Sequence, residues 1–295
     1  MSNPMPEAVT VVMRSFNEAW AIGDSIREVF NQDFTGSIEL IVIDSGSSDR
    51  SIEIIRQDGR ARLIEIPLGT YVPGPVLNMG AREASHDWIV YLNADAKPVG
   101  RDWLSNLLRP CLDDPKFGAA FSRQIPRPDC QAVFAHDYDR CFGLERESKN
   151  WDHFFSMVSC VTHRSVLAKV PIREDLQYAE DDEWTRRLIA AGYHVIYAIE
   201  SLAMHSHNYT LKQTYKRAFG DAKAMAATSK VRPKDVNLHY YVVLGWIKDV
   251  VRDIRWCLSN GRMFGIPHAM AVRLAMRLGR RAGHHAGWKH YQRES

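Results

Sequence analysis

The feature that most constrains the fold is a series of short apolar runs that alternate with a stretch of helical periodicity. Residues 9–13, 39–43, 62–66 and 88–92 each have the composition of a strand, and residues 19–30 carry apolar side chains on one face of a helix. The runs are apolar almost throughout, which is typical of strands that are covered on both faces. The sequence therefore predicts an α/β fold with a mostly parallel, twisted sheet and helices on both of its faces.

Two of these runs end at carboxylates. Asp44 follows one strand and opens the turn Ser45–Asp49, and Asn93 and Asp95 follow another. In an open parallel sheet, ligands bind beyond the carboxyl ends of the strands. Asp44 is expected either to accept local backbone N–H groups in a turn or to accept the N3–H of a uracil or thymine ring. Asp95 either belongs to a simple strand-end turn or binds Mg²⁺ or Mn²⁺ at the phosphates of a nucleotide diphosphate.

Two further polar segments lie downstream. Glu180-Asp181-Asp182-Glu183 begins a helix predicted over 181–191, which Gly192 ends. Acidic residues in a first turn complement the helix dipole, but four in a row repel one another, and like charges raise the pKa of a carboxyl toward that of a general base. His205 and His207 follow a strand predicted over 194–198. Histidines two residues apart on a strand point to opposite faces, so we expect one of the two, His205, to face the site.

The composition limits the classes of protein. The chain has 295 residues, enough for one large or two ordinary domains, and a net charge of +3, too small to indicate a nucleic-acid partner. Its five cysteines are scattered and form no C-x-x-C pair, which favours a reducing compartment over a disulfide framework. The N-terminal segment has no secretion-signal pattern, and no apolar run reaches the roughly 18 residues of a spanning helix. We therefore predict a cytoplasmic location, with any membrane contact peripheral.

The C-terminal part is helical and basic. Residues 238–258 are predicted to form an amphipathic helix whose apolar face consists of Tyr240, Val243, Leu244, Ile247, Val251 and Ile254. After Asp253 the chain carries eight basic residues, which are Arg255, Arg262, Arg273, Arg277, Arg280, Arg281, Lys289 and Arg293. Two interpretations remain open: the helix packs on the catalytic domain, or the tail docks on an anionic membrane surface, where each basic residue contributes about 1 kcal/mol.

The order and spacing of these motifs resemble those of the family-2 inverting glycosyltransferases of the GT-A fold. The resemblance covers about residues 8–220 and rests on five stretches: Ser15-Phe16-Asn17-Glu18, Asp44-Ser45-Gly46-Ser47-Ser48-Asp49, Asn78-Met79-Gly80-Ala81, Asn93-Ala94-Asp95 at the Asp-x-Asp position, and Glu180-Asp181 at the Glu-Asp position. Three further stretches are similar to bacterial rhamnosyltransferase-type members: Arg123-Gln124-Ile125-Pro126, Glu180–Trp184 and His205–Thr210.

This resemblance implies a role for each motif residue. Asp181 would be the catalytic base, and Asp95 and His205 would bind a divalent Mn²⁺ or Mg²⁺. The nucleotide would be bound by Ser15, Asn17, Glu18, Asp44, Asn78 and Asn93. On the acceptor side the resemblance implies Glu180, Asp182 and Trp184. Two positions depart from the family pattern. Asn93 replaces the first Asp of the usual pair, which removes one negative charge, and Leu77 stands where many members carry Arg.

The implied function is inverting transfer of a sugar, with L-rhamnose from dTDP-rhamnose the favoured donor, to a hydroxyl of a saccharide or lipid-linked acceptor in cell-surface polysaccharide synthesis. Residues 1–122 would form the nucleotide-sugar-binding half, 123–230 the acceptor and catalytic half, and 231–295 a helical extension. Another dTDP- or UDP-hexose donor and a non-catalytic nucleotide-sugar-binding protein are the alternatives. Arg14–Glu18 contains no glycine, which disfavours a nucleotidyltransferase, and the absence of G-x-G-x-x-G disfavours a dinucleotide-dependent oxidoreductase.

Overall fold

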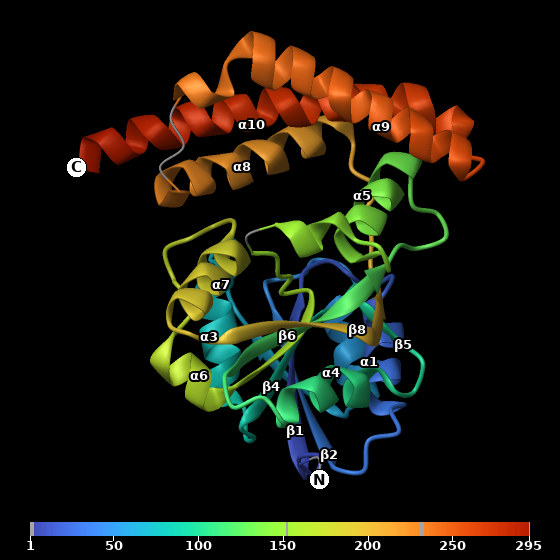
Figure 1. Cartoon of the computed structure of the whole chain (residues 1–295). Coiled ribbons are helices and arrows are strands. Elements are labelled where there is room, and N and C mark those ends of the chain that lie inside the picture. Colours follow the sequence, from blue (N-terminus) through green and yellow to red (C-terminus); the bar gives the residue numbers. More distant parts are fainter. Residues whose placement is uncertain (1–2, 152, 230–232, 295) are drawn as a thin grey trace. The chain divides into compact units, whose positions relative to one another are not determined.

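The chain divides into two compact units. The computed structural model describes residues 3–151, 153–229 and 233–294 (Figure 1). Unit 1 consists of Met1–Pro126, Phe142–Asp175 and Glu180–His205, and unit 2 of Arg127–Cys141, Leu176–Ala179 and Ser206–Ser295.

Unit 1 is built on a sheet in which eight strands are described, in the order β3-β2-β1-β4-β7-β6-β8-β5. The strands are β1 (Ala8–Ser15), β2 (Ser37–Asp44), β3 (Ala61–Glu65), β4 (Trp88–Asn93), β5 (Lys97–Val99), β6 (Phe117–Ile125), β7 (Ser159–His163) and β8 (His194–Met204). The helices are α1 (Ile22–Phe30), α2 (Ser51–Asp58), α3 (Pro73–Glu83), α4 (Trp103–Leu112), α6 (Arg164–Lys169) and α7 (Glu180–Ala190), with a 3₁₀ turn at Glu147–Asn150.

Both faces of this sheet are covered, as the apolar runs predict. On one face, Val11 and Met13 of β1 belong to the same buried cluster as Ile26 of α1 and Leu107 of α4. On the other face, Val12 packs so closely against α3 that a Cβ at Gly80 would collide with it. The β3-β2-β1-β4 half is parallel, as is the β6–β8 pair, whereas β7 and β5 run antiparallel to their neighbours. The sheet is therefore mostly parallel, and the predicted fold class is confirmed.

Individual elements differ from the prediction in places. The sequence also predicts a strand over 155–161, whereas the structure has β7 at Ser159–His163. The strand predicted over 194–198 continues to Met204. Several helices, α3 and α4 among them, were not predicted. The first starts at Pro73, a residue that suits the first turn of a helix because it needs no N–H partner there, and the second contains Pro110.

Unit 2 is helical. Its elements are α5 (Ala132–Phe142), α8 (Leu211–Ser229), a 3₁₀ turn at Pro233–Val236, a π-helical segment (Leu238–Leu244), α9 (Gly245–Ser259), a 3₁₀ turn at Met263–Gly265 and α10 (Ile266–Glu294). Val133 and Phe134 of α5 form a small core with Ala269 and Val272 of α10. The predicted helix over 238–258 is confirmed in extent, although its first two turns have π geometry.

The α8–α10 pair is held at close range by a glycine seam, defined as Gly279, Gly283 and Gly287 of α10. A Cβ atom at any of these glycines would lie closer than 3.0 Å to a backbone carbonyl oxygen of α8, from Tyr215, Phe219 and Lys223 in turn. Only glycine permits this approach, because every other residue carries a Cβ.

Two further features agree with the composition. All five cysteines are free thiols. Among the described residues, no helix combines the length and the apolar composition that crossing a membrane requires.

Candidate functional site

The ends of three neighbouring strands bring polar residues of unit 1 together. The register pairs Ser15 of β1 with Asp44 of β2, and Arg14 of β1 with Asn93 of β4. These residues therefore lie side by side at the carboxyl edge of the parallel half of the sheet, where ligands bind in folds of this kind.

Asp44 is fully buried and serves as the centre of the turn that follows β2. Its Oδ1 accepts the backbone N–H groups of Gly46 at 3.0 Å and Ser47 at 2.7 Å, and its Oδ2 accepts the hydroxyl of Ser47 at 2.7 Å. Gly46 has a φ of 83°, which a residue with a Cβ adopts only at a cost. The local turn contacts expected of Asp44 are present, and they fix the orientation of its carboxylate.

The turn after β1 is tied to this second turn. Asn17 has a φ of 55°, in the left-handed region that asparagine tolerates better than most residues, so the turn forms without a glycine. Its Oδ1 accepts the N–H of Ser48 at 2.8 Å, and its own N–H donates to the Ser47 hydroxyl at 2.8 Å. Ser15, at the end of β1, is buried, and its hydroxyl oxygen has no hydrogen-bond partner among the described residues.

Glu18 has the most perturbed carboxyl of this edge. Burial raises its pKa to about 8, and the negative charges of Asp95, Asp44 and Asp49 act in the same direction, while Arg14 opposes them. Its Oε2 has no hydrogen-bond partner among the described residues. A carboxyl crowded by like charges in this way favours the approach of a cation.

Arg14 is a site residue that the sequence interpretation missed. Its guanidinium donates to Asn93 Oδ1 at 2.8 Å and to the Tyr71 hydroxyl at 3.1 Å, and it lies 3.6 Å from Glu180 Oε1. Burial opposes its charge, but Tyr71 and Glu180 lead the interactions that raise its pKa above the usual value. The available signal was an arginine in a mostly apolar strand, one residue before its polar end at Ser15.

The acidic start of α7 is compensated by cations. Asp182 lies 2.5 Å from His153 Nε2 and accepts the Arg186 Nε–H at 2.9 Å. Glu183 accepts from Arg187 Nε at 2.7 Å and from Arg187 Nη2 at 2.8 Å. Together with the Arg14–Glu180 pair, these contacts offset the mutual repulsion that the sequence suggested. Asp181 Oδ1 accepts the backbone N–H of Asp182 at 2.8 Å, which points its carboxylate along the first turn of the helix.

Asp95 and His205 form the part of the edge best suited to a metal. Both side chains are buried, and His205 Nε2 lies 3.5 Å from Asp95 Oδ2. His205 Nδ1 is 2.9 Å from Gln124 Oε1, an acceptor, so Nδ1 carries the proton and the Nε2 lone pair faces the carboxylate. Gln124 is itself held by Ser156. A carboxylate and a histidine oriented by a second hydrogen bond are the donor set of a typical metal site.

His207 was set aside because of strand alternation. That argument does not apply, because β8 ends at Met204 and both His205 and His207 lie beyond it. His207 belongs to unit 2.

Two of the expected site residues are engaged in packing. Asn78 donates from α3 to the Ile172 carbonyl at 2.8 Å and to Glu174 at 2.9 Å, and it lines a hollow of about 300 Å³ between α3 and α6. Trp184 is fully buried on α7, where its indole N–H donates to the Val170 carbonyl at 2.7 Å. Their contacts fix the loop before α7 rather than line the strand edge.

A mostly parallel sheet covered on both faces, with buried carboxylates at its carboxyl edge, is the architecture of a nucleotide-binding α/β protein. Residues 10–170 match the model of the glycosyl transferase family 2. The chain belongs to this family and is a glycosyltransferase.

Similar proteins agree with this assignment. The chain is 26% identical over 288 residues to the O-antigen chain rhamnosyltransferase RfbN of Salmonella typhimurium, with 94% of this chain and 90% of the relative covered. It is 26% identical to the glycosyltransferase AglE of Haloferax volcanii, over 70% of this chain and 68% of that protein. The solved structure of a Pyrobaculum calidifontis mannosyltransferase in complex with GDP-Man and Mn²⁺ superposes with a TM-score of 0.58 at 21% identity, covering 90% of this chain and 73% of that one.

Proposed function

We propose that this glycosyltransferase transfers L-rhamnose from dTDP-rhamnose to a hydroxyl of a saccharide or lipid-linked acceptor, with inversion, in the synthesis of a cell-surface polysaccharide. The donor sugar is supported by the relatives RfbN of Salmonella typhimurium and WbaN of Salmonella anatum, both named O-antigen chain rhamnosyltransferases, each of which aligns with 94% of this chain. The observation that best supports a transfer reaction is a pair of possible metal ligands, Asp95 Oδ2 and His205 Nε2, at the edge of a family-2 sheet.

The donor set of this pair fits a divalent cation. Asp95 and His205 would hold Mn²⁺ or Mg²⁺, because one offers a carboxylate oxygen and the other an imidazole lone pair fixed by Gln124. Related folds solved with Mn²⁺ and a nucleotide or nucleotide sugar support this choice. When bound, the cation stabilises the negative charge of the departing nucleotide diphosphate.

The chain's own residues carry the remaining roles. Asp181 is the proposed base that accepts the proton of the acceptor hydroxyl as its oxygen attacks the anomeric carbon. Arg14 contacts both Asn93 and Glu180, and in this way it fixes the carboxyl edge of the sheet relative to the start of α7. Nucleotide binding is assigned to Ser15, Asn17, Glu18, Asp44, Asn78 and Asn93, and acceptor-side contacts to Glu180, Asp182 and Trp184. Trp184 and Asn78 would act through the loop that they hold.

We assign nucleotide-sugar binding to residues 1–122, acceptor binding and catalysis to 123–230, and a supporting role to the helical extension at 231–295. A lipid-linked acceptor would place the reaction at the cytoplasmic face of a membrane.

Release of nucleoside diphosphate from a panel of dTDP- and UDP-sugars, with and without Mn²⁺, tests the proposal. We expect dTDP-rhamnose to be consumed fastest, and only when the metal is present. Asp181→Asn should consume it far more slowly than the wild type. Faster consumption of another hexose donor would reassign the sugar. Binding of dTDP-rhamnose without any release, in the presence of a saccharide acceptor, would instead favour a nucleotide-sugar-binding protein.

A further inference from the structure

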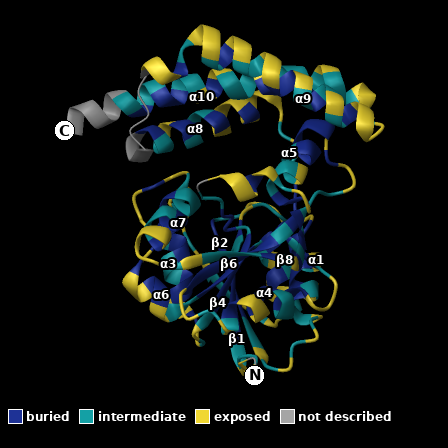
Figure 2. Cartoon of the chain, in the orientation of Figure 1, coloured by how far each residue is buried: buried dark blue, intermediate teal, exposed yellow. Residues whose placement is uncertain are grey.

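Helix α9 and its flanking segments present apolar side chains to solvent. The exposed fraction is 69% for Tyr240, 46% for Ile247, 58% for Leu258 and 93% for Phe264. Figure 2 shows the exposed residues along this helix. The apolar stripe is defined as Leu238, Tyr240, Val243, Leu244, Ile247, Val251, Leu258, Met263 and Phe264. Large apolar side chains exposed along one face of a helix indicate an interaction site rather than a solvated face.

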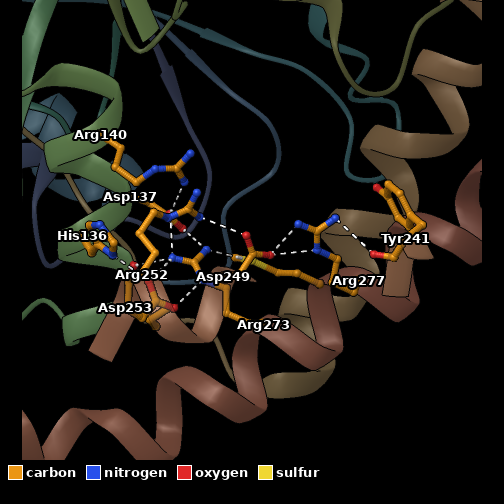
Figure 3. Close-up of polar contacts among 11 residues, drawn as sticks. His136, Asp137, Arg140, Tyr241, Asp249, Arg252, Asp253, Arg273 and Arg277 are labelled. Atoms are coloured by element: carbon orange, nitrogen blue, oxygen red, sulfur yellow. Dashed lines mark hydrogen bonds and ion pairs between the residues drawn. The ribbon is translucent and has the colours of Figure 1, made fainter. Parts of the chain in front are cut away.

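The opposite side of α9 is charged and buried. Asp253 is 1% exposed, accepts the Arg273 Nε–H at 2.7 Å and lies 2.6 Å from His136 Nδ1. Arg273 also donates to both oxygens of Asp137 of α5, each at 2.8 Å. Figure 3 shows that these side chains from α5, α9 and α10 point toward one another.

A second ion pair fixes the same side one turn earlier. Asp249 lies 2.7 Å from Arg277 Nη2 and accepts from Arg252 at 3.1 Å. Rotating α9 to bury its apolar stripe would leave these acids and arginines without their partners in a region of low polarity, which is strongly unfavourable. The helix is therefore fixed with its charged side inward and its apolar side outward.

These ion pairs reduce the number of basic residues that could contact an anionic membrane, compared with the eight that the sequence suggested. Arg273 and Arg277 are committed to buried pairs, and the side chains of Lys289 and Arg293 lie outside the described ones. Eight basic residues are therefore not available to lipid. Between residues 236 and 288 the acids are Asp249 and Asp253, and both are buried. The exposed charges of this segment are consequently cationic, with Lys248, Arg255 and Arg280 among them.

We propose that the apolar stripe of α9 inserts into the headgroup region of an anionic lipid membrane, with Lys248 and Arg255 in contact with lipid phosphates. The helical part of the stripe, from Tyr240 to Leu258, spans about 27 Å at the rise of an α-helix, as expected of a helix that lies in the plane of a membrane. The exposed cations Lys248 and Arg255 match an anionic surface. The inference deepens the proposed function, since a lipid-linked acceptor would be met at that surface, but it concerns binding alone.

Flotation with vesicles tests it, using the full-length chain without donor, acceptor or metal. The vesicles are phosphatidylcholine alone, and equal parts of phosphatidylcholine and phosphatidylglycerol. We expect the wild type to float with the anionic vesicles. Phe264→Glu should weaken partitioning about tenfold or more, the effect of withholding one large apolar side chain. Lys248→Gln should weaken it about fivefold, and only with the anionic vesicles.

Leu144→Glu is the matched control, because Leu144 is 65% exposed and lies in unit 1. It should float as the wild type does. Equal flotation of the wild type and Phe264→Glu, or no flotation of either, would overturn the proposal. A wild-type dimer that Phe264→Glu converts to a monomer, with no flotation, would assign the stripe to a second copy of the chain instead. Because flotation is measured without substrates, its failure leaves the proposed transfer reaction standing, and a failure to consume any sugar donor leaves a flotation result standing.

Discussion

Glu18 in unit 1 and Asp253 in unit 2 are both withdrawn from water, yet their pKa values shift in opposite directions. Burial raises the pKa of Glu18 to about 8, and the negative charges of Asp95, Asp44 and Asp49 act in the same direction. Asp253 is also desolvated, but hydrogen bonds from His136 and Arg273 outweigh the burial and lower its pKa. Unit 2 balances its buried charges within itself, whereas the strand edge of unit 1 keeps excess negative charge. A bound metal ion can neutralise that excess negative charge when the substrate binds. The contrast therefore separates charges that stabilise the fold from charges that serve the reaction.

The most severe test of this contrast is Asp181→Asn. We expect turnover to fall by about 10²–10⁴-fold, the usual contribution of a positioned base, while thermal stability and nucleotide binding stay near wild type. Steady-state kinetics with the preferred donor measure the effect. Asp175→Asn is the matched control, because Asp175 is an exposed aspartate that pairs with Arg173 and has no assigned role in the site. A variant that retains more than about a third of wild-type kcat would move the base elsewhere, with Asp182 the next candidate.

Asp95→Ala should come next in effect, with loss of metal-stimulated activity. Chelation of the wild type should reproduce it, and titration calorimetry with Mn²⁺ measures the affinity directly. Gln124→Ala, which removes the hydrogen bond to His205 Nδ1, should weaken Mn²⁺ binding about 10–100-fold.

The metal titration has a matched control in Asp114→Ala, which removes the carboxylate of an exposed Asp–His pair, and it should leave Mn²⁺ binding unchanged. Full activity of the wild type in excess chelator would contradict the metal role. His207→Ala decides whether the second histidine contributes.

In unit 2, Arg273→Met should be a stability variant. Removing one partner of a buried ion pair costs about 3–5 kcal/mol, because the remaining acids are left uncompensated. Chemical denaturation followed by circular dichroism measures the loss. Arg280→Met, at an exposed position of the same helix, should have little effect. Equal stability of the two variants would mean that the ion pairs of unit 2 do not fix α9.

The smallest expected effect concerns pH. The raised pKa of Glu18 means that the folded state favours its protonated form, so its contribution to stability is complete below pH 4.5 and is lost as the pH rises to about 8. Glu18→Gln should therefore gain at least about 1 kcal/mol relative to wild type between pH 5 and pH 8, since one pKa unit corresponds to about 1.4 kcal/mol. Denaturation in chelator at both pH values measures it.

The lowered pKa of Asp253 acts in the opposite sense, since its contribution is present above pH 3.8 and is lost on acidification. An identical pH profile for wild type and Glu18→Gln would refute the crowding of the strand edge.

The parts that the sequence could predict are those that depend on local pattern. Strands β1, β2 and β4 have apolar runs, and Asp44 and Asp95 stand where such runs must end, so the edge of the sheet was foreseeable. Contacts between residues far apart in the chain could not be predicted. Arg14 acquires its role only when β4 and α7 approach it. Asp137 lies 136 residues from Arg273, so no periodicity could show that the charged side of α9 would be the buried one.

The glycine seam has a consequence for how sequence tolerance in this protein should be interpreted. In a saturation mutagenesis experiment scored by abundance, Gly279, Gly283 and Gly287 should tolerate almost no replacement, since even alanine would push the α8 backbone away. Their neighbour Arg280, which is exposed, should accept most residues. The resulting pattern, one intolerant position in every four, would look as severe as that of a reaction centre while reporting nothing but the distance between two helices.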